Sequence, residues 1–79
     1  MPRYFFDLEL DDGIPTTDEE GLMLADVRAA KVEAARSISD VAKGMIEGDQ
    51  PLTTLTVTVQ TADGPIMTAA FSLQMATVN

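Results

Sequence analysis

The chain has 79 residues, with 13 acidic side chains against 5 basic ones, and it contains neither histidine nor cysteine. A chain of this length buries only one hydrophobic core, so we expect a single domain over residues 1–79. Imidazole and thiolate supply most transition-metal ligands and many side-chain nucleophiles. Their absence excludes zinc sites, cysteine nucleophiles and histidine-based triads.

A half-buried strand is predicted from Arg3 to Leu10, because apolar residues occupy every second position from Tyr4 onward. Phe5 interrupts the polar side of this alternation. Asp11-Asp12-Gly13 then predicts a turn, since Asp and Gly tolerate a positive φ. Residues 21–24 predict a short second strand.

One amphipathic helix is predicted to follow Asp26, whose side chain can accept hydrogen bonds from the first-turn N–H groups as an N-cap. The helix should end near Glu47, and Gly44 in its last turn should weaken it by up to about 1 kcal/mol relative to Ala. Alanines on the apolar side predict close approach to a sheet. The apolar stripe comprises Val27, Ala30, Ala34, Ile38, Val41 and Met45, with Ala35, Ala42 and Ile46 beside it.

The last part of the chain predicts an antiparallel hairpin. Alternating β-branched residues from Thr54 to Gln60 indicate one strand, Asp63-Gly64 is a hairpin turn signal, and alternation from Met67 to Met75 indicates the second strand. Only Asp63 is charged between residues 50 and 79. The hairpin therefore lacks the charged side chains that usually guard strand edges.

This order of elements predicts an α+β two-layer sandwich, with one amphipathic helix on a small, mainly antiparallel sheet of three or four strands. The sheet face away from the helix would be only mildly polar and exposed in a monomer, so we expect self-association as a homodimer, through either that face or an edge strand. The residues expected on that face are Phe5, Thr54, Thr56, Thr58, Ile66, Ala70 and Ser72. The start lacks a basic leader followed by an apolar run, and no apolar stretch reaches about 18 residues, so a cytoplasmic location is expected.

The negative charge is concentrated near the N-terminus. Residues 1–26 hold eight acids and one base, a net −7, whereas residues 27–79 hold five acids and four bases, a net −1. An acidic field of this kind repels phosphate backbones and anionic lipid, so neither nucleic acid nor a membrane is an expected partner.

Five carboxylates in the acidic turn region are the candidate site residues. Divalent cations prefer several carboxylate oxygens, but the spacing does not fit an EF-hand loop. Three interpretations stay open: a docking surface for a partner protein, a ligand or divalent-cation binding module, and a solvated loop that aids solubility. We predict a docking surface, and we predict neither a metal site nor a cofactor. The residues are Asp11, Asp12, Asp18, Glu19 and Glu20.

Enzymatic activity is not expected. Paired carboxylates do acid–base work only when one of them lies in an apolar pocket, whereas these lie in turns. The serines have no histidine to activate them, and no catalytic residue is predicted. The sequence therefore indicates a small interaction or structural domain.

Two N-terminal segments carry a family resemblance. The opening M-P-R-Y-F-F-D at residues 1–7 and D-E-E-G at residues 18–21, with the Asp12-Gly13 turn, the helix start and the Asp63-Gly64 hairpin, resemble a family of short bacterial proteins of unknown function. The likeness covers nearly the whole chain and implies a stand-alone α+β domain without an assigned activity, cofactor or catalytic residue. A weaker analogy, of fold alone, is to small antitoxin-like domains that neutralise a basic protein.

Overall fold

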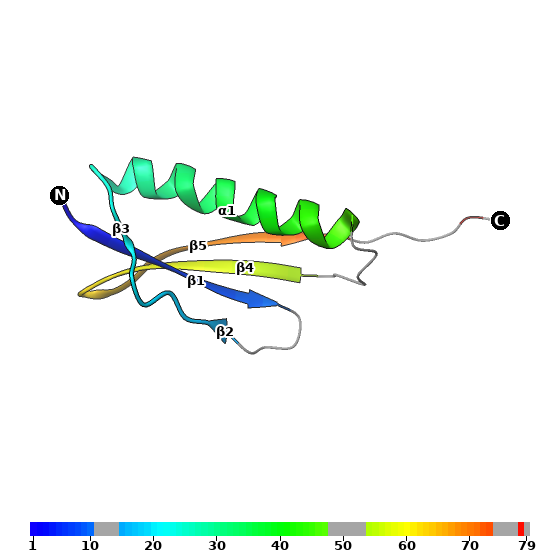
Figure 1. Ribbon diagram of the computed structural model, residues 1–79, viewed down its shortest axis with the longest axis horizontal. Helices are drawn as coiled ribbons and strands as arrows, with labels where there is room; N and C mark the ends of the chain where they lie inside the picture. Colours follow the sequence, from blue (N-terminus) through cyan, green and yellow to red (C-terminus); the bar gives the residue numbers. More distant parts are fainter. Residues whose placement is uncertain (11–14, 48–53, 74–77, 79) are drawn as a thin grey trace.

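The computed structural model describes residues 1–10, 15–47, 54–73 and 78, without the side chains of residues 45 and 47. One helix lies along one face of an antiparallel sheet (Figure 1), so the predicted α+β two-layer sandwich is confirmed. The predicted turn at residues 11–13 and the predicted strand end at Met75 lie outside the described residues. The elements are β1 (Arg3–Leu10), β2 (Pro15–Thr16), β3 (Leu22–Met23), α1 (Val27–Glu47), β4 (Thr54–Thr61) and β5 (Gly64–Ser72).

Within the described residues the sheet has five strands, whereas the sequence pattern predicts three or four. Its order is β2-β1-β4-β5. β3 also pairs with β1, on the same side as β2 but at the opposite end of the strand. The additional strand is Pro15–Thr16, which is too short to show any alternation. The predicted short strand at residues 21–24 is present as Leu22–Met23.

The core lies between α1 and the two long strands of the hairpin. Small side chains on the helix let it approach the sheet closely, as the alanine-rich stripe predicts, and α1 packs on both β4 and β5. The buried residues are Tyr4, Ala30, Ala34, Ile38, Ala42, Leu55, Val57 and Val59.

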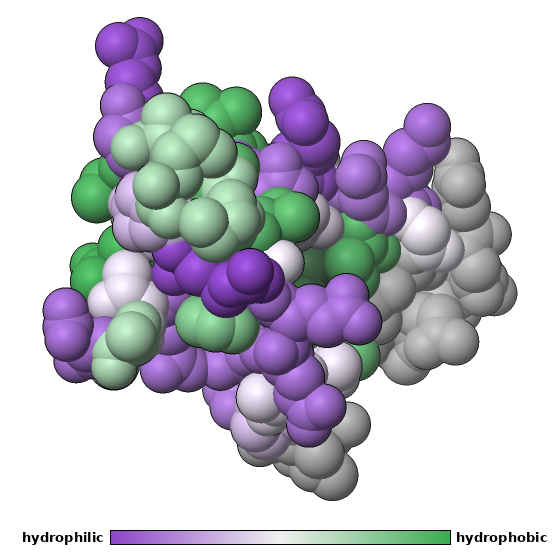
Figure 2. All heavy atoms as spheres, turned by 60° about the vertical axis from the view of Figure 1, so that its left-hand side comes forward, coloured by the Kyte–Doolittle hydropathy of each residue, from purple (hydrophilic) through white to green (hydrophobic). Residues whose placement is uncertain are grey.

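Three residues assigned to the helix stripe are exposed instead. Val27 is 54% exposed and Ile46 is 52% exposed, and both stand in the end turns of α1. Ala35 is exposed as well. Leu22 and Met23 are further exposed apolar side chains near the start of the helix. At that end of the molecule, Figure 2 shows apolar groups interleaved with polar ones.

The helix start and the hairpin turn follow local sequence signals. Asp26 Oδ1 accepts a hydrogen bond of 2.9 Å from the Ala29 N–H, which confirms the predicted N-cap. The hairpin turn comes one residue earlier than predicted: Ala62 and Asp63 form the loop, and Gly64 pairs with Thr61 as the first residue of β5. Gly64 has a φ of 117°, a conformation that suits glycine.

On the described residues, α1 lacks the combination of length and apolar character that a membrane-crossing helix requires.

Replacing Gly44 with alanine should stabilise the protein. Gly44 lies within α1, and apart from its chain neighbours and the backbone of its own helix, no described atom lies within 4 Å of the position that an added Cβ would occupy. Because Gly costs about 0.8–1.0 kcal/mol relative to Ala inside a helix, we expect Gly44→Ala to raise the free energy of unfolding by up to about 1 kcal/mol in urea denaturation. A decrease in stability would contradict the placement of Gly44 in open space on a regular helix.

Candidate functional site

The segment from β2 to β3 runs along the outer side of β1, and part of it has more residues than the part of β1 that it faces. Leu8 lies opposite Thr16 and Tyr4 lies opposite Leu22, and both pairings are antiparallel. Between these pairs, the five residues 17–21 therefore face only the three residues 5–7 of β1. The strand-to-strand ladder is interrupted there, and this bulged stretch contains the D-E-E-G residues.

The Asp18 carboxylate fills the interruption. Its Oδ2 accepts a hydrogen bond of 3.0 Å from the Phe6 N–H of β1, which takes the place of a bond from a neighbouring strand. Its Oδ1 accepts hydrogen bonds from the N–H groups of Glu20, at 3.2 Å, and Gly21, at 3.0 Å. One side chain thus satisfies an edge donor of β1 and holds the turn that follows.

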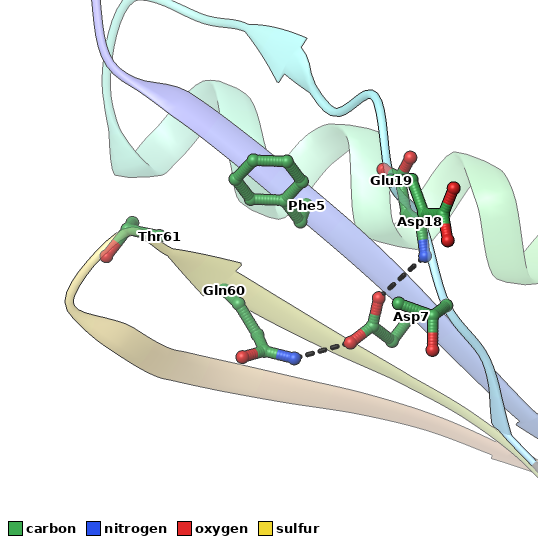
Figure 3. Close-up of a pocket in the computed structure, with 7 residues that line it drawn as sticks. Phe5, Asp7, Asp18, Glu19, Gln60 and Thr61 are labelled. Atoms are coloured by element: carbon green, nitrogen blue, oxygen red, sulfur yellow. Dashed lines mark hydrogen bonds between the residues drawn. The ribbon is translucent and has the colours of Figure 1, made fainter.

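Asp7 locks the same segment from the sheet side. Asp7 Oδ1 accepts a hydrogen bond of 2.9 Å from the Asp18 N–H, and its Oδ2 accepts one from the Gln60 side-chain amide (Figure 3). Gln60 belongs to β4, so Asp7 connects β4, β1 and the bulged stretch. Asp18 is therefore held at both its backbone and its carboxylate.

Glycine is the only residue type that fits at position 21, where the chain returns to β1. The φ of Gly21 is 71°, and a Cβ added there would lie 2.8 Å from the Tyr4 carbonyl oxygen and 2.9 Å from Arg3 Cγ. Contacts that short force a displacement of the backbone. Arg3 also donates a hydrogen bond from its guanidinium to the Glu20 carbonyl oxygen.

The environment of Asp18 favours its ionised form. Burial of the side chain acts to raise its pKa, but hydrogen bonds from the N–H groups of Gly21, Phe6 and Glu20 act in the opposite direction and outweigh it. The pKa of Asp18 is therefore lowered from its ordinary value of 3.8.

A shallow depression of about 350 Å³ lies beside this network, on the sheet face away from α1. Phe5 and Gln60 provide its wall on the sheet, while Asp7, Asp18 and Glu19 provide carboxylates. Among the residues that the structure describes, no basic side chain lines it. The described lining residues are Phe5, Asp7, Thr17, Asp18, Glu19, Gln60 and Thr61.

The structure brings together three of the five predicted site residues. Asp18, Glu19 and Glu20 lie in the bulged stretch, whereas Asp11 and Asp12 lie outside the described residues. The Asp18 carboxylate points inward to backbone donors, and Glu19 and Glu20 are exposed. Among the described residues, no cluster of three or more acidic side chains could hold a metal ion.

Sequence reasoning did not assign five residues of the depression to the site: Phe5, Asp7, Thr17, Gln60 and Thr61. Phe5 did leave a signal, because an aromatic residue on the polar side of an alternating strand requires a neighbour that covers it. Gly21 packs against it: an added Cβ at Gly21 would lie 3.0 Å from Phe5 Cδ1. Gln60 had no local signal, because its partner Asp7 is 53 residues away in the sequence.

A family model matches the chain over residues 3–72, which include both the segment 3–7 and the segment 18–21. The chain belongs to the DUF6894 family. This family is described as a domain of unknown function, so membership indicates a shared domain and does not assign an activity. Neither the curated proteins nor the solved structures give a match to this DUF6894 domain.

Removing the Asp18 charge should destabilise the DUF6894 domain and reduce its sensitivity to acid. Asparagine keeps one acceptor oxygen, so Asp18→Asn leaves either Phe6 or the Gly21 turn without a partner, at a cost of about 1–3 kcal/mol at neutral pH. The folded pKa of Asp18 is lowered, so its ionisation stabilises the fold above the ordinary value of 3.8, and this stabilisation is lost as the pH falls through the folded pKa.

Urea denaturation near neutral pH and at about pH 3 tests this expectation. Glu19→Gln is the matched control, since it removes an exposed adjacent charge without touching the network. We expect the acid-induced loss of stability to be smaller in Asp18→Asn and unchanged in Glu19→Gln. Equal pH profiles for all three proteins would show that Asp18 has no special role.

Proposed function

We propose that this protein is a non-enzymatic interaction domain that binds a basic segment of another protein at the depression between Asp7 and Glu19. One observation supports the proposal most strongly: within the described part of the chain, the depression combines an aromatic wall with three carboxylates and no basic side chain. The aromatic ring and the carboxylates both attract a cation. An enzyme would require a proton-transfer group or nucleophile in an activating environment, and the residues of the depression offer neither.

The carboxylates suit an arginine side chain in particular. An ionised carboxylate has about four lone-pair sites, and hydrogen bonds from described residues use two of them at Asp7 and three at Asp18. Acceptor capacity therefore remains while both groups are held in place. A guanidinium is planar, donates in a fork and stacks on aromatic rings, so it can contact a carboxylate and the Phe5 ring together.

The charge of the N-terminal region supports the same partner chemistry. Glu19 is exposed at the rim of the depression, Glu20 is exposed beside it, and residues 1–26 carry one base against eight acids. A field of one sign attracts a basic segment from a distance and raises its association rate at low salt. The antitoxin-like analogy belongs to the same class, because it too requires a basic partner.

The cytoplasmic location and the bacterial origin expected from the sequence stay predictions.

A peptide of about ten residues with alternating arginine and serine provides a direct probe of the depression. We expect saturable NMR shifts at Phe5, Asp7, Glu19 and Gln60, and weaker binding as salt is added. Reversing the rim charge by Glu19→Lys should weaken binding about tenfold, which corresponds to about 1.4 kcal/mol.

Asp40→Lys supplies the control, because Asp40 is an exposed acid on α1 and its reversal changes the net charge by the same amount. We expect Asp40→Lys to alter the affinity less than about twofold. The proposal would be abandoned if the peptide gave no saturable shifts, or if both reversals weakened binding equally, since the attraction would then depend on net charge alone.

A further inference from the structure

One edge of the sheet is covered and the other is open. The outer side of β1 is covered by β2, by β3 and, between them, by the Asp18 carboxylate. The other edge is β5, which extends over nine residues and pairs with β4 alone within the described part of the chain. An uncovered strand edge presents backbone donors and acceptors to any further strand.

β5 also lacks the usual side-chain guards. None of its residues is charged. Its irregular features stand at its beginning, where Pro65 lacks an N–H and the register shifts opposite Val59 and Gln60. Residues 67–72 pair regularly with β4, so an uninterrupted edge of about 20 Å is available.

The alternation of backbone groups identifies the outward donors of this edge. The Phe6 N–H faces away from β4, toward Asp18, so its partner Val59 directs its own backbone groups toward β5. Met67 opposite Val59 therefore bonds to β4, and the next residue, Thr68, directs its N–H and C=O outward. The same alternation directs the backbone groups of Ala70 and Ser72 outward.

Electrostatics favours a second copy of the chain as the occupant of this edge. The acids of β1 and the bulged stretch lie on the far side of β4 from β5. If two β5 edges paired, the two β1 strands would be five strand spacings apart, about 24 Å, which is well beyond the Debye length of about 8 Å at physiological salt. Pairing through the β1 side would instead bring the two acidic regions together.

We propose that two copies of this protein associate through their β5 edges and form one continuous sheet. A two-fold axis between identical strands requires them to be antiparallel, so Thr68, Ala70 and Ser72 of each copy supply the new backbone hydrogen bonds. On the helix side, Met67 and Phe71 are only partly buried, and the second copy covers them further. The pairing uses neither the depression nor its carboxylates, so it stands independently of the proposed docking function.

Light scattering coupled to gel filtration tests the pairing at about 100 µM and after dilution. We expect the wild-type chain to have the mass of two copies at the higher concentration. Thr68→Pro removes an outward N–H without removing a bond to β4, and it should give a folded monomer. Thr68→Ala removes the same side chain but keeps the N–H, and it should remain a dimer.

Hydrogen exchange of the wild-type chain keeps the proposal testable should Thr68→Pro not fold. The amides of Thr68, Ala70 and Ser72 should lose protection on dilution, whereas those of Met67, Ala69 and Phe71 should keep it. A monomeric wild type at about 1 mM would overturn the proposal. So would a Thr68→Pro dimer, or exchange at Thr68, Ala70 and Ser72 that does not depend on concentration.

Discussion

The carboxylate of Asp18 is the constraint on which one whole side of this sheet depends. β2 and β3 have two residues each, and neither could remain on the edge of β1 through its own backbone bonds. Asp18 joins them by accepting hydrogen bonds from Phe6 on the strand and from Gly21 in the turn. Hydrogen bonds to a charged group each contribute about 1.5–3 kcal/mol, a substantial share of the stability of a domain this small.

The contacts around Asp18 hold the segments 3–7 and 18–21 together. Asp7 holds the backbone of Asp18, the Arg3 guanidinium donates to the Glu20 carbonyl, and Gly21 passes so close to Tyr4 that no side chain fits. The two segments are halves of one interlocked edge. Closing that edge leaves β5 as the open one and keeps the acidic groups on the opposite side of the sheet, which separates the proposed surface for a basic partner from the proposed surface for a second copy.

Hydrophobic periodicity and local capping chemistry predicted the large elements. β1, α1 and β4 have long alternating or amphipathic patterns, and the Asp26 N-cap acts within three residues of itself. The edge could not be read in the same way, because Asp18 and Phe6 are 12 residues apart. From sequence, residues 18–20 resemble a solvated acidic run. Only the Asp-x-x-Gly spacing, typical of a side chain that bonds the backbone two or three residues on, hints at the role of Asp18.

Amide hydrogen exchange at Phe6 tests the central claim most directly. The Phe6 N–H has no strand partner, since it lies between the pairings of Tyr4 with Leu22 and of Leu8 with Thr16. We predict that this amide is protected as strongly as those of Tyr4 and Leu8, because the Asp18 carboxylate accepts its hydrogen bond. Exchange of Phe6 at the rate of an unprotected amide, with Tyr4 and Leu8 still protected, would contradict the claim.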